Sequence, residues 1–278
     1  MTVTRVPNPV LSTPPLENGD KLTRVEFEQR YEALPQVKKA ELIEGTVYIA
    51  SPLHAKAHGK PHAPMRGWLI AYEAATPHVE TLDNPTVRLD SDNEPQPDAL
   101  LRLEVGGNST ISDDDYVEGA PELIVEIAAS SASFDLHEKL NVYRRNQVQE
   151  YLVWRVYDGE FDWFRLQAGK YVQLAANEAS ILCSIAFPGL WLDRSALLAG
   201  DLTTVLNVLQ QGLETPAHQT FVERLSSWVK LSVKPVLIST PLNQLYCLPS
   251  QTLRVERSRN PSARCLYLPT YQLFEAER

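Results

Sequence analysis

The sequence has few cysteines and no long apolar run, and these absences exclude several classes of protein. Cys183, Cys247 and Cys265 lie far apart and form no CxxC pair, so neither a disulfide framework nor a zinc ribbon is expected. The first 20 residues are polar and proline-rich and lack the apolar core of a signal peptide. No apolar stretch approaches the roughly 18 residues that a membrane span needs. We therefore expect a cytoplasmic protein with no membrane partner.

Several enzyme motifs are also absent. The sequence contains no GxSxG, GxxxxGK[ST] or GxGxxG, which are the motifs that α/β-hydrolases, P-loop proteins and Rossmann proteins need. These three classes are therefore not supported. His54, His58 and His62 recur every four residues, which on a helix would align three imidazoles for zinc. A glycine and two prolines interrupt that stretch, so a zinc site is not expected there.

A basic excess is lacking too, and this argues against a nucleic-acid partner. The formal net charge is −9, whereas surfaces that bind phosphate usually show an excess of lysine and arginine. The argument is limited, because metal-site carboxylates are neutralised by their ion and a summed charge does not exclude a local basic patch. The 278 residues, 44% apolar and 22% charged, have ordinary globular usage.

The chain is long enough for one sizeable domain with appendages. Residues 1–20 are expected to form a flexible N-terminal arm, and residues 21–200 the main domain. Two helices within residues 201–231 should pack on that domain. Residues 232–278 carry recurrent prolines without a sustained apolar face, so we expect an irregular or disordered tail.

Apolar patterns predict a sheet with helices around it. PELIVEIA (residues 121–128) is almost continuously apolar apart from Glu122 and Glu126, which is typical of a strand buried on both faces. The glycine- and aspartate-rich segment 106–119 is expected to be a surface loop. Helices are predicted over residues 24–34, 65–75, 133–145, 201–213 and 218–229, and strands over 40–43, 46–50, 79–82, 86–89, 99–105, 121–128, 150–157, 160–166, 169–174 and within 179–192.

Three residues have a definite chemical use when they are taken together. Asp98 precedes one predicted strand, Glu126 ends the buried strand, and Lys139 lies on the helix that follows. Two carboxylates that converge from neighbouring strands form a hard oxygen site suited to Mg²⁺ or Mn²⁺, and a nearby ammonium can stabilise charge on phosphate oxygens. Each residue alone is commonplace and is usually solvated. Their order along the chain nevertheless predicts metal-dependent catalysis.

Five runs of sequence carry a resemblance to a known family. They are ELIEG (41–45), QPDALL (96–101), APELIVEIAASSAS (120–133), DLHEKLNVYRRNQVQEYLVW (135–154) and FPGLWL (187–192). Together they resemble the "Uma two" restriction-endonuclease family, a branch of the PD-(D/E)XK nuclease superfamily, over about residues 20–230. The resemblance implies an α/β (α+β) restriction-endonuclease-like fold, with a central mixed β-sheet flanked by helices.

The same resemblance implies roles for single residues. Asp98 and Glu126 would be the family's acidic pair, serving both as catalytic residues and as metal ligands. The superfamily's lysine stands two residues after the second acidic residue, but here that position is Ala128. Lys139 would be the substitute. Glu44 resembles the additional N-terminal acidic residue of such sites and is the third candidate ligand, with Glu41 as its alternative.

These expectations together predict a hydrolase: a Mg²⁺- or Mn²⁺-dependent endonuclease that cleaves DNA phosphodiesters with metal-activated water. Cutting both strands of a duplex takes two sites, which favours a homodimer. Two alternatives stay open. One is a catalytically inactive nuclease-fold module that binds nucleic acid or protein, and the other is a glycosidase that uses Asp98 and Glu126 as its carboxylate pair. The choice between DNA and RNA is also open.

Overall fold

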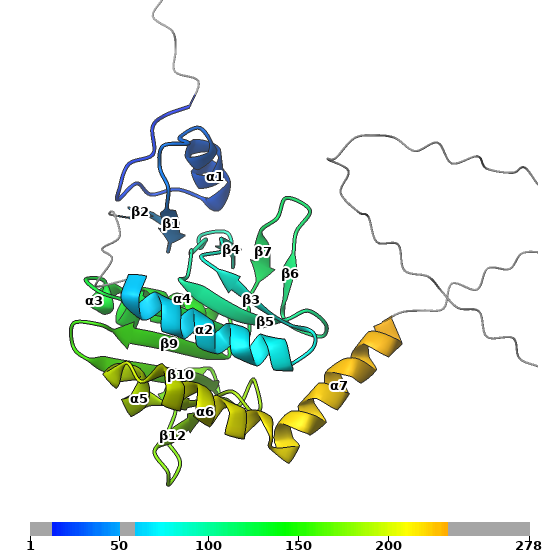
Figure 1. Cartoon of the computed structure of the whole chain (residues 1–278). Coiled ribbons are helices and arrows are strands. Elements are labelled where there is room, and N and C mark those ends of the chain that lie inside the picture. Colours follow the sequence, from blue (N-terminus) through cyan, green and yellow to red (C-terminus); the bar gives the residue numbers. More distant parts are fainter. Residues whose placement is uncertain (1–12, 51–58, 233–278) are drawn as a thin grey trace, which may run out of the picture. The chain divides into compact units, whose positions relative to one another are not determined.

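A computed structural model describes residues 13–50 and 59–232, with side chains as far as residue 228 (Figure 1). All of these residues belong to one unit of the chain. Within the described residues, no helix combines the length and the apolar character needed to cross a membrane.

The N-terminal part contains a capped helix and a tight hairpin. Helix α1 (Arg24–Glu32) has Thr23 as its N-cap, and the Thr23 hydroxyl accepts a hydrogen bond from the Glu26 N–H. Strands β1 (Ala40–Ile43) and β2 (Thr46–Ile49) are antiparallel and are joined by Glu44-Gly45. Both turn residues have positive φ, 51° and 68°, which is the conformation that matches the twist of a two-residue hairpin.

Residues 13–20 lie against this hairpin. Leu16 is buried in a small cluster with Phe27 and Val47, and the Gly19 N–H donates to the Val47 carbonyl at 2.8 Å. The other residues of the predicted arm, 1–12, lie outside the described residues, as do residues 233–278 of the predicted tail. The division into arm, domain, capping helices and tail therefore stays a prediction.

The central element is a six-stranded mixed sheet. Strands β8 and β9 are parallel, and every other neighbouring pair is antiparallel. This confirms the predicted mixed sheet. In spatial order the strands are β11 (Lys170–Gln173), β10 (Glu160–Gln167), β9 (Glu150–Arg155), β8 (Leu123–Ala128), β5 (Ala99–Leu103) and β3 (Val79–Asp83).

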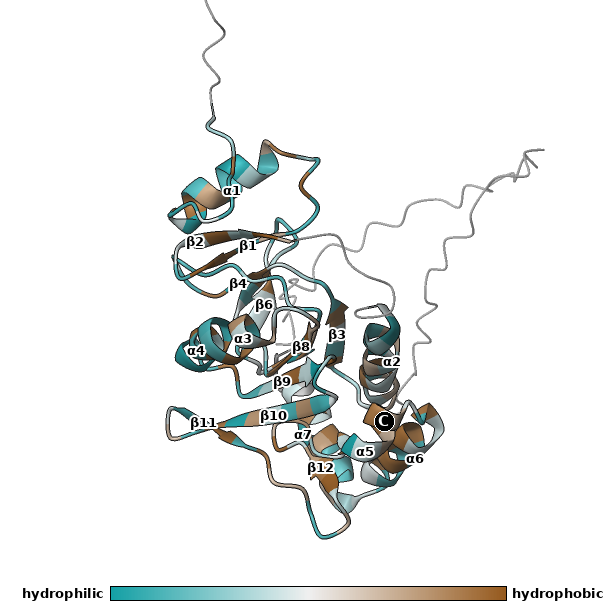
Figure 2. Ribbon diagram, turned by 90° about the vertical axis from the view of Figure 1, so that its left-hand side faces the viewer, coloured by the Kyte–Doolittle hydropathy of each residue, from teal (hydrophilic) through white to brown (hydrophobic). Residues whose placement is uncertain are grey.

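Helices cover both faces of this sheet, and Figure 2 shows the strands between them. Alternate residues of β8 enter two different cores, because successive side chains of a strand point to opposite faces. Val125 and Ile127 pack in the larger core, and Ile124 and Ala128 in the second one. The larger core is covered by α2 (Lys60–Ala75), α5 (Arg194–Ala199), α6 (Leu202–Leu213) and α7 (Pro216–Ser232), and the second by α3 (Ala132–Phe134), the π-helical turn η2 (Asp135–Lys139) and α4 (Leu140–Arg145).

The expectation of a loop over residues 106–119 is wrong. Strands β6 (Ser109–Ile111) and β7 (Val117–Gly119) pair there and join β4 (Val87–Arg88) in a separate three-stranded sheet. The acidic residues that suggest a solvated loop instead contact a largely buried cation: Arg88 Nη1 lies 2.8 Å from Asp114 and 3.1 Å from Glu118. Two further strands, β12 (Ile181–Cys183) and β13 (Trp191–Asp193), form a hairpin.

One close contact in the fold gives a stability prediction. A Cβ atom added at Gly212 in α6 would overlap the Gly189 carbonyl oxygen and lie 2.7 Å from Trp191 Cγ. We expect Gly212→Ala to lower the free energy of unfolding by on the order of 2–3 kcal/mol, because the backbone of the neighbouring turn would have to move to make room for the added methyl group. Urea unfolding followed by tryptophan fluorescence would measure this.

Gly67 provides the matched control. It is exposed in α2, and an added Cβ meets nothing within 4 Å. Gly67→Ala should be neutral or raise the stability by up to about 1 kcal/mol, because alanine favours a helix over glycine. Equal stability of the two variants would contradict the close packing of α6 against the Gly189 turn.

Candidate active site

Asp98 and Glu126 are brought together by the pairing of β5 with β8. Ala99 lies opposite Val125, and continuing this antiparallel register places Asp98 opposite Glu126. Asp98 Oδ2 also accepts a hydrogen bond of 2.7 Å from the backbone N–H of Ile127. Both carboxylates are 3% exposed. The predicted acidic pair therefore shares one face of the sheet, the face covered by α4.

Lys139 reaches this pair from the π-helical turn η2. Its Nζ lies 2.9 Å from Glu126 Oε1, 2.7 Å from Glu41 Oε1 and 4.0 Å from Asp135 Oδ1. A π-helical turn widens the helix by one residue, and such turns are frequent at functional sites. Asp135 and Lys139, the first and last residues of this turn, are both buried. The structure thus brings Asp98, Glu126 and Lys139 into one cluster.

The N-terminal acidic member of the cluster is Glu41, whereas Glu44 lies elsewhere. Glu41 Oε1 accepts from Lys139 and also from the backbone N–H of Gln96 at 2.7 Å, which ties β1 to the segment before Asp98. Glu44 lies in the exposed hairpin turn, and its carboxylate pairs with Arg145 at 3.0 Å. The structure does not place Glu44 with the other candidate ligands, and Glu41 takes that position.

Two more residues complete the site, and neither was predicted from the sequence. The Tyr143 hydroxyl donates to Glu126 Oε1 at 2.8 Å, and Lys39 Nζ lies 3.6 Å from Asp98 Oδ1. No local pattern distinguishes either residue from an ordinary helix or surface residue. A signal was present for Glu41, because it is a charged residue inside an otherwise apolar four-residue strand.

Burial and charge set the protonation of these groups. Burial raises the pKa of Glu126 to about 8, and the Lys139 ammonium works in the opposite direction. Burial by itself would lower the pKa of Lys139, but the carboxylates of Glu126, Glu41 and Asp135 outweigh it and hold that pKa well above its ordinary value. Lys139 is therefore a charged ammonium near neutral pH.

Comparison with known proteins identifies the family. The sequence profile of the Uma2 family, described as "Putative restriction endonuclease", matches residues 25–195. The chain belongs to the Uma2 family. Membership supports a nuclease, a hydrolase that acts on nucleic acid, with the restriction-endonuclease-like fold.

The chain is also similar to a solved structure. The crystal structure of "a putative nuclease belonging to DUF820" from Anabaena variabilis ATCC 29413 is similar to this Uma2 chain at 12% sequence identity and a TM-score of 0.44. The similarity covers 61% of this chain and 97% of that one. No curated protein matches the sequence.

The site of this Uma2 protein fits a divalent cation by its donors and by its charge. We call the following six side chains the acidic cluster: the carboxylates of Glu41, Asp98, Glu126 and Asp135 with the ammonium groups of Lys39 and Lys139. When all are ionised, four negative charges face two positive ones, and two negative charges are left for a cation. Carboxylate oxygens are the hard ligands that Mg²⁺ and Mn²⁺ prefer.

The cluster is not a ready-made metal cage. In residues 13–50 and 59–228, no three or more histidine, cysteine, aspartate or glutamate side chains are arranged to enclose an ion. Mg²⁺ usually takes only one or two carboxylates from the protein and keeps several waters. The pair Asp98 and Glu126 is a donor set of that kind.

His62 is the one described member of the histidine series that suggested zinc. Its Nε2 lies 3.0 Å from the Asp98 carbonyl oxygen and 3.1 Å from Asp83 Oδ1. His54 and His58 lie outside the described residues. In the Uma2 chain His62 therefore ties the first turns of α2 to the backbone of Asp98.

The hydroxyl of Tyr143 gives a prediction for this site. We expect Tyr143→Phe to lower the rate of nucleic-acid cleavage about tenfold, because Glu126 loses the hydrogen bond that holds its Oε1 in place while the phenylalanine ring still fills the space. Tyr171→Phe is the matched control, since its hydroxyl donates to the Val148 carbonyl on the same side of the sheet without touching the acidic cluster. Equal rates for the two variants would contradict a role for Tyr143 in holding Glu126.

Proposed function

We propose that this protein is a Mg²⁺- or Mn²⁺-dependent endonuclease that hydrolyses DNA phosphodiesters in the cytoplasm, with Asp98, Glu126 and Lys139 as its catalytic residues. One observation supports this most strongly. Residue 128, where the superfamily pattern has its lysine, is alanine, yet the Lys139 ammonium lies 2.9 Å from Glu126 Oε1. A cation from another part of the chain thus accompanies the acidic pair.

Asp98 and Glu126 would hold the divalent ion. Such an ion supplies Lewis-acid chemistry, because it activates water and neutralises charge on the phosphate. The chain keeps both carboxylates in place for this task. The Ile127 N–H holds Asp98 Oδ2, and the Tyr143 hydroxyl and the Lys139 ammonium hold Glu126 Oε1.

Lys139 would act as a charge and a hydrogen-bond donor. A general base must give up its proton near the working pH, but the surrounding carboxylates hold the pKa of Lys139 well above its ordinary value. Two of its three N–H groups donate to Glu41 and Glu126, which leaves one for an oxygen of the substrate. This arrangement stabilises negative charge that develops on the phosphate in the transition state.

DNA as the substrate and a homodimer as the active form belong to this proposal. A phosphodiester at the acidic cluster needs the bound cation, because the carboxylates alone would repel it. Hydrolysis of both strands of a duplex needs a second copy of the site, which a two-fold dimer would supply.

The proposal is tested by incubating the purified protein with supercoiled plasmid, single-stranded DNA and RNA in Mg²⁺, in Mn²⁺ and in EDTA. We expect DNA to be cut in Mg²⁺ or Mn²⁺ and left intact in EDTA. If no substrate is cut with either metal while DNA or RNA is still retained by the protein, the fold serves as a binding module. If only RNA is cut, the proposed catalytic site stands and the proposed substrate, DNA, is wrong.

A further inference from the structure

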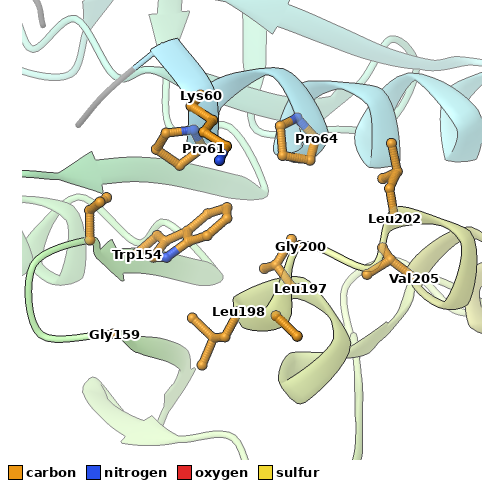
Figure 3. A pocket seen from close by; sticks show the side chains of 12 residues that line it. Lys60, Pro61, Pro64, Trp154, Gly159, Leu197, Leu198, Gly200, Leu202 and Val205 are labelled. Carbon is orange, nitrogen blue, oxygen red and sulfur yellow. The ribbon is translucent and has the colours of Figure 1, made fainter. Parts of the chain in front are cut away.

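A second feature lies on the opposite face of the sheet, where the structure contains a cavity of about 420 Å³ (Figure 3). It lies between the first turns of α2, the ends of β9 and β10, and the segment from α5 to α6. Its lining is mainly apolar, and its volume falls within the range of small-molecule sites. The residues that line it include Lys60, Pro61, Pro64 and Trp154.

The cavity contains an unused hydrogen-bond donor. The buried indoles of Trp68 and Trp163 donate to the Trp191 carbonyl and to the Glu150 carboxylate. Trp154 is only 8% exposed, yet its indole N–H donates to no acceptor in the described part of the chain. This nitrogen is not fully shielded from solvent, so its N–H is available to a ligand in the cavity.

A lysine also lines the cavity. Lys60 makes no ion pair with any residue that the structure describes, and Figure 3 shows its side chain turning from α2 toward Trp154. The apolar rings of Pro61 and Pro64 line the same cavity. The combination suits a flat ring with hydrogen-bond acceptors that is attached to an anion.

The cavity and the acidic cluster lie at the same end of the parallel strands. Trp154 on β9 pairs with Ile127 on β8, the residue directly after Glu126. The first turns of α2 form one wall of the cavity, and His62 of those turns contacts the Asp98 carbonyl. The first turns of α2 therefore contact both the cavity and the backbone of Asp98.

We propose that the cavity binds a nucleobase of the nucleic-acid strand whose phosphodiester lies at the acidic cluster. The base lies at the edge of the Trp154 indole, where one of its carbonyl or ring-nitrogen acceptors takes the in-plane Trp154 N–H, and Lys60 contacts the attached phosphate. This inference rests on the proposed function, because it assigns the cavity to the substrate of that site.

Indole N–H signals in a ¹⁵N–¹H NMR spectrum test this directly, with Trp154→Phe used to assign the signal of Trp154. The probes are a deoxynucleoside monophosphate, the corresponding abasic deoxyribose phosphate, and benzoate. We expect the mononucleotide to move the Trp154 signal in a saturable way and the other two to leave it in place. The Trp68 signal serves as an internal control, because its N–H is already bonded. An unmoved Trp154 signal, or equal movement with abasic phosphate or benzoate, would overturn the inference.

Lys60→Gln provides a second variant that preserves the fold, because this side chain is exposed. We expect it to weaken mononucleotide binding roughly threefold to tenfold, as the loss of one phosphate contact would. Lys170→Gln, an exposed lysine on the edge strand β11, should leave binding unchanged. Equal affinities of the two variants would contradict the role of Lys60.

The two proposals can fail separately. If the protein binds a mononucleotide at Trp154 but cuts no nucleic acid, the proposed catalysis is wrong and the base-binding cavity stands. Metal-dependent cleavage with an unmoved Trp154 signal would remove the cavity from substrate binding and keep the catalytic site.

Discussion

Replacing Asp98 with asparagine is expected to lower metal-dependent DNA cleavage by at least about 100-fold, because the ion would lose a charged ligand and each 1.4 kcal/mol of lost transition-state stabilisation costs tenfold in rate. The fold should survive the change. Asparagine still offers a side-chain oxygen to the Ile127 N–H, which the Asp98 carboxylate accepts at 2.7 Å. Cleavage of supercoiled plasmid, followed over time in Mg²⁺ at matched protein concentration, measures the effect.

Asp162→Asn is the matched control for this variant. Asp162 lies on β10, where its carboxylate pairs with Arg155 at 2.7 Å and contacts no residue of the acidic cluster. The same loss of one carboxylate there should leave the cleavage rate within about twofold of the wild type. If Asp98→Asn and Asp162→Asn cut plasmid equally well, Asp98 is not a ligand of the catalytic ion.

Replacing Lys139 with methionine should have two large effects at once. Cleavage should fall by at least about 100-fold, because the ammonium that stabilises charge on the phosphate is gone. The free energy of unfolding should fall by about 3–5 kcal/mol, because removing one partner of a buried ion pair leaves the other charge uncompensated. Here three carboxylates lose their cation: Glu126, Glu41 and Asp135.

A double variant separates the two effects. Glu126→Gln removes one of the carboxylates that Lys139→Met leaves without a cation. The double variant should therefore be more stable than Lys139→Met alone but should recover none of the activity. Denaturant unfolding of the single and double variants gives the coupling energy. Wild-type cleavage by Lys139→Met, or additive losses of stability in the double variant, would show that Lys139 has no part in this cluster.

The sequence predicts the framework of the site well, since the framework depends on local patterns. The apolar run of β8, with one acidic residue near its end, indicates a buried strand that carries Glu126. Asp98 stands directly before another buried strand, and antiparallel pairing of the two strands brings the carboxylates together. A lysine on the next helical segment can reach back over the strand ends, as Lys139 does.

The choice between Glu41 and Glu44 could not be made from the sequence. The two residues lie three apart around one hairpin, and only the exact extent of the turn decides which of them faces the sheet. Glu44 has positive φ and belongs to the turn, so its carboxylate points to Arg145 at the surface. Glu41 belongs to the strand and is buried.

Contacts between segments that are distant in the sequence could not be predicted either. Tyr143 and Lys39 join the site through hydrogen bonds and ion pairs with residues 17 and 59 positions away, and no local pattern marks either of them. The strands within residues 106–119 were missed for a similar reason. Their acidic residues neutralise Arg88, which lies about 25–30 positions earlier in the sequence.

Anomalous diffraction from crystals of the full chain soaked in Mn²⁺ tests the metal site most directly. We expect one strong peak between the carboxylates of Asp98 and Glu126, beside the Lys139 ammonium, and no peak there in crystals of Asp98→Asn. A wild-type crystal that shows no Mn²⁺ at this position at saturating concentration, or a peak that persists in Asp98→Asn, would contradict a catalytic metal site built on this pair.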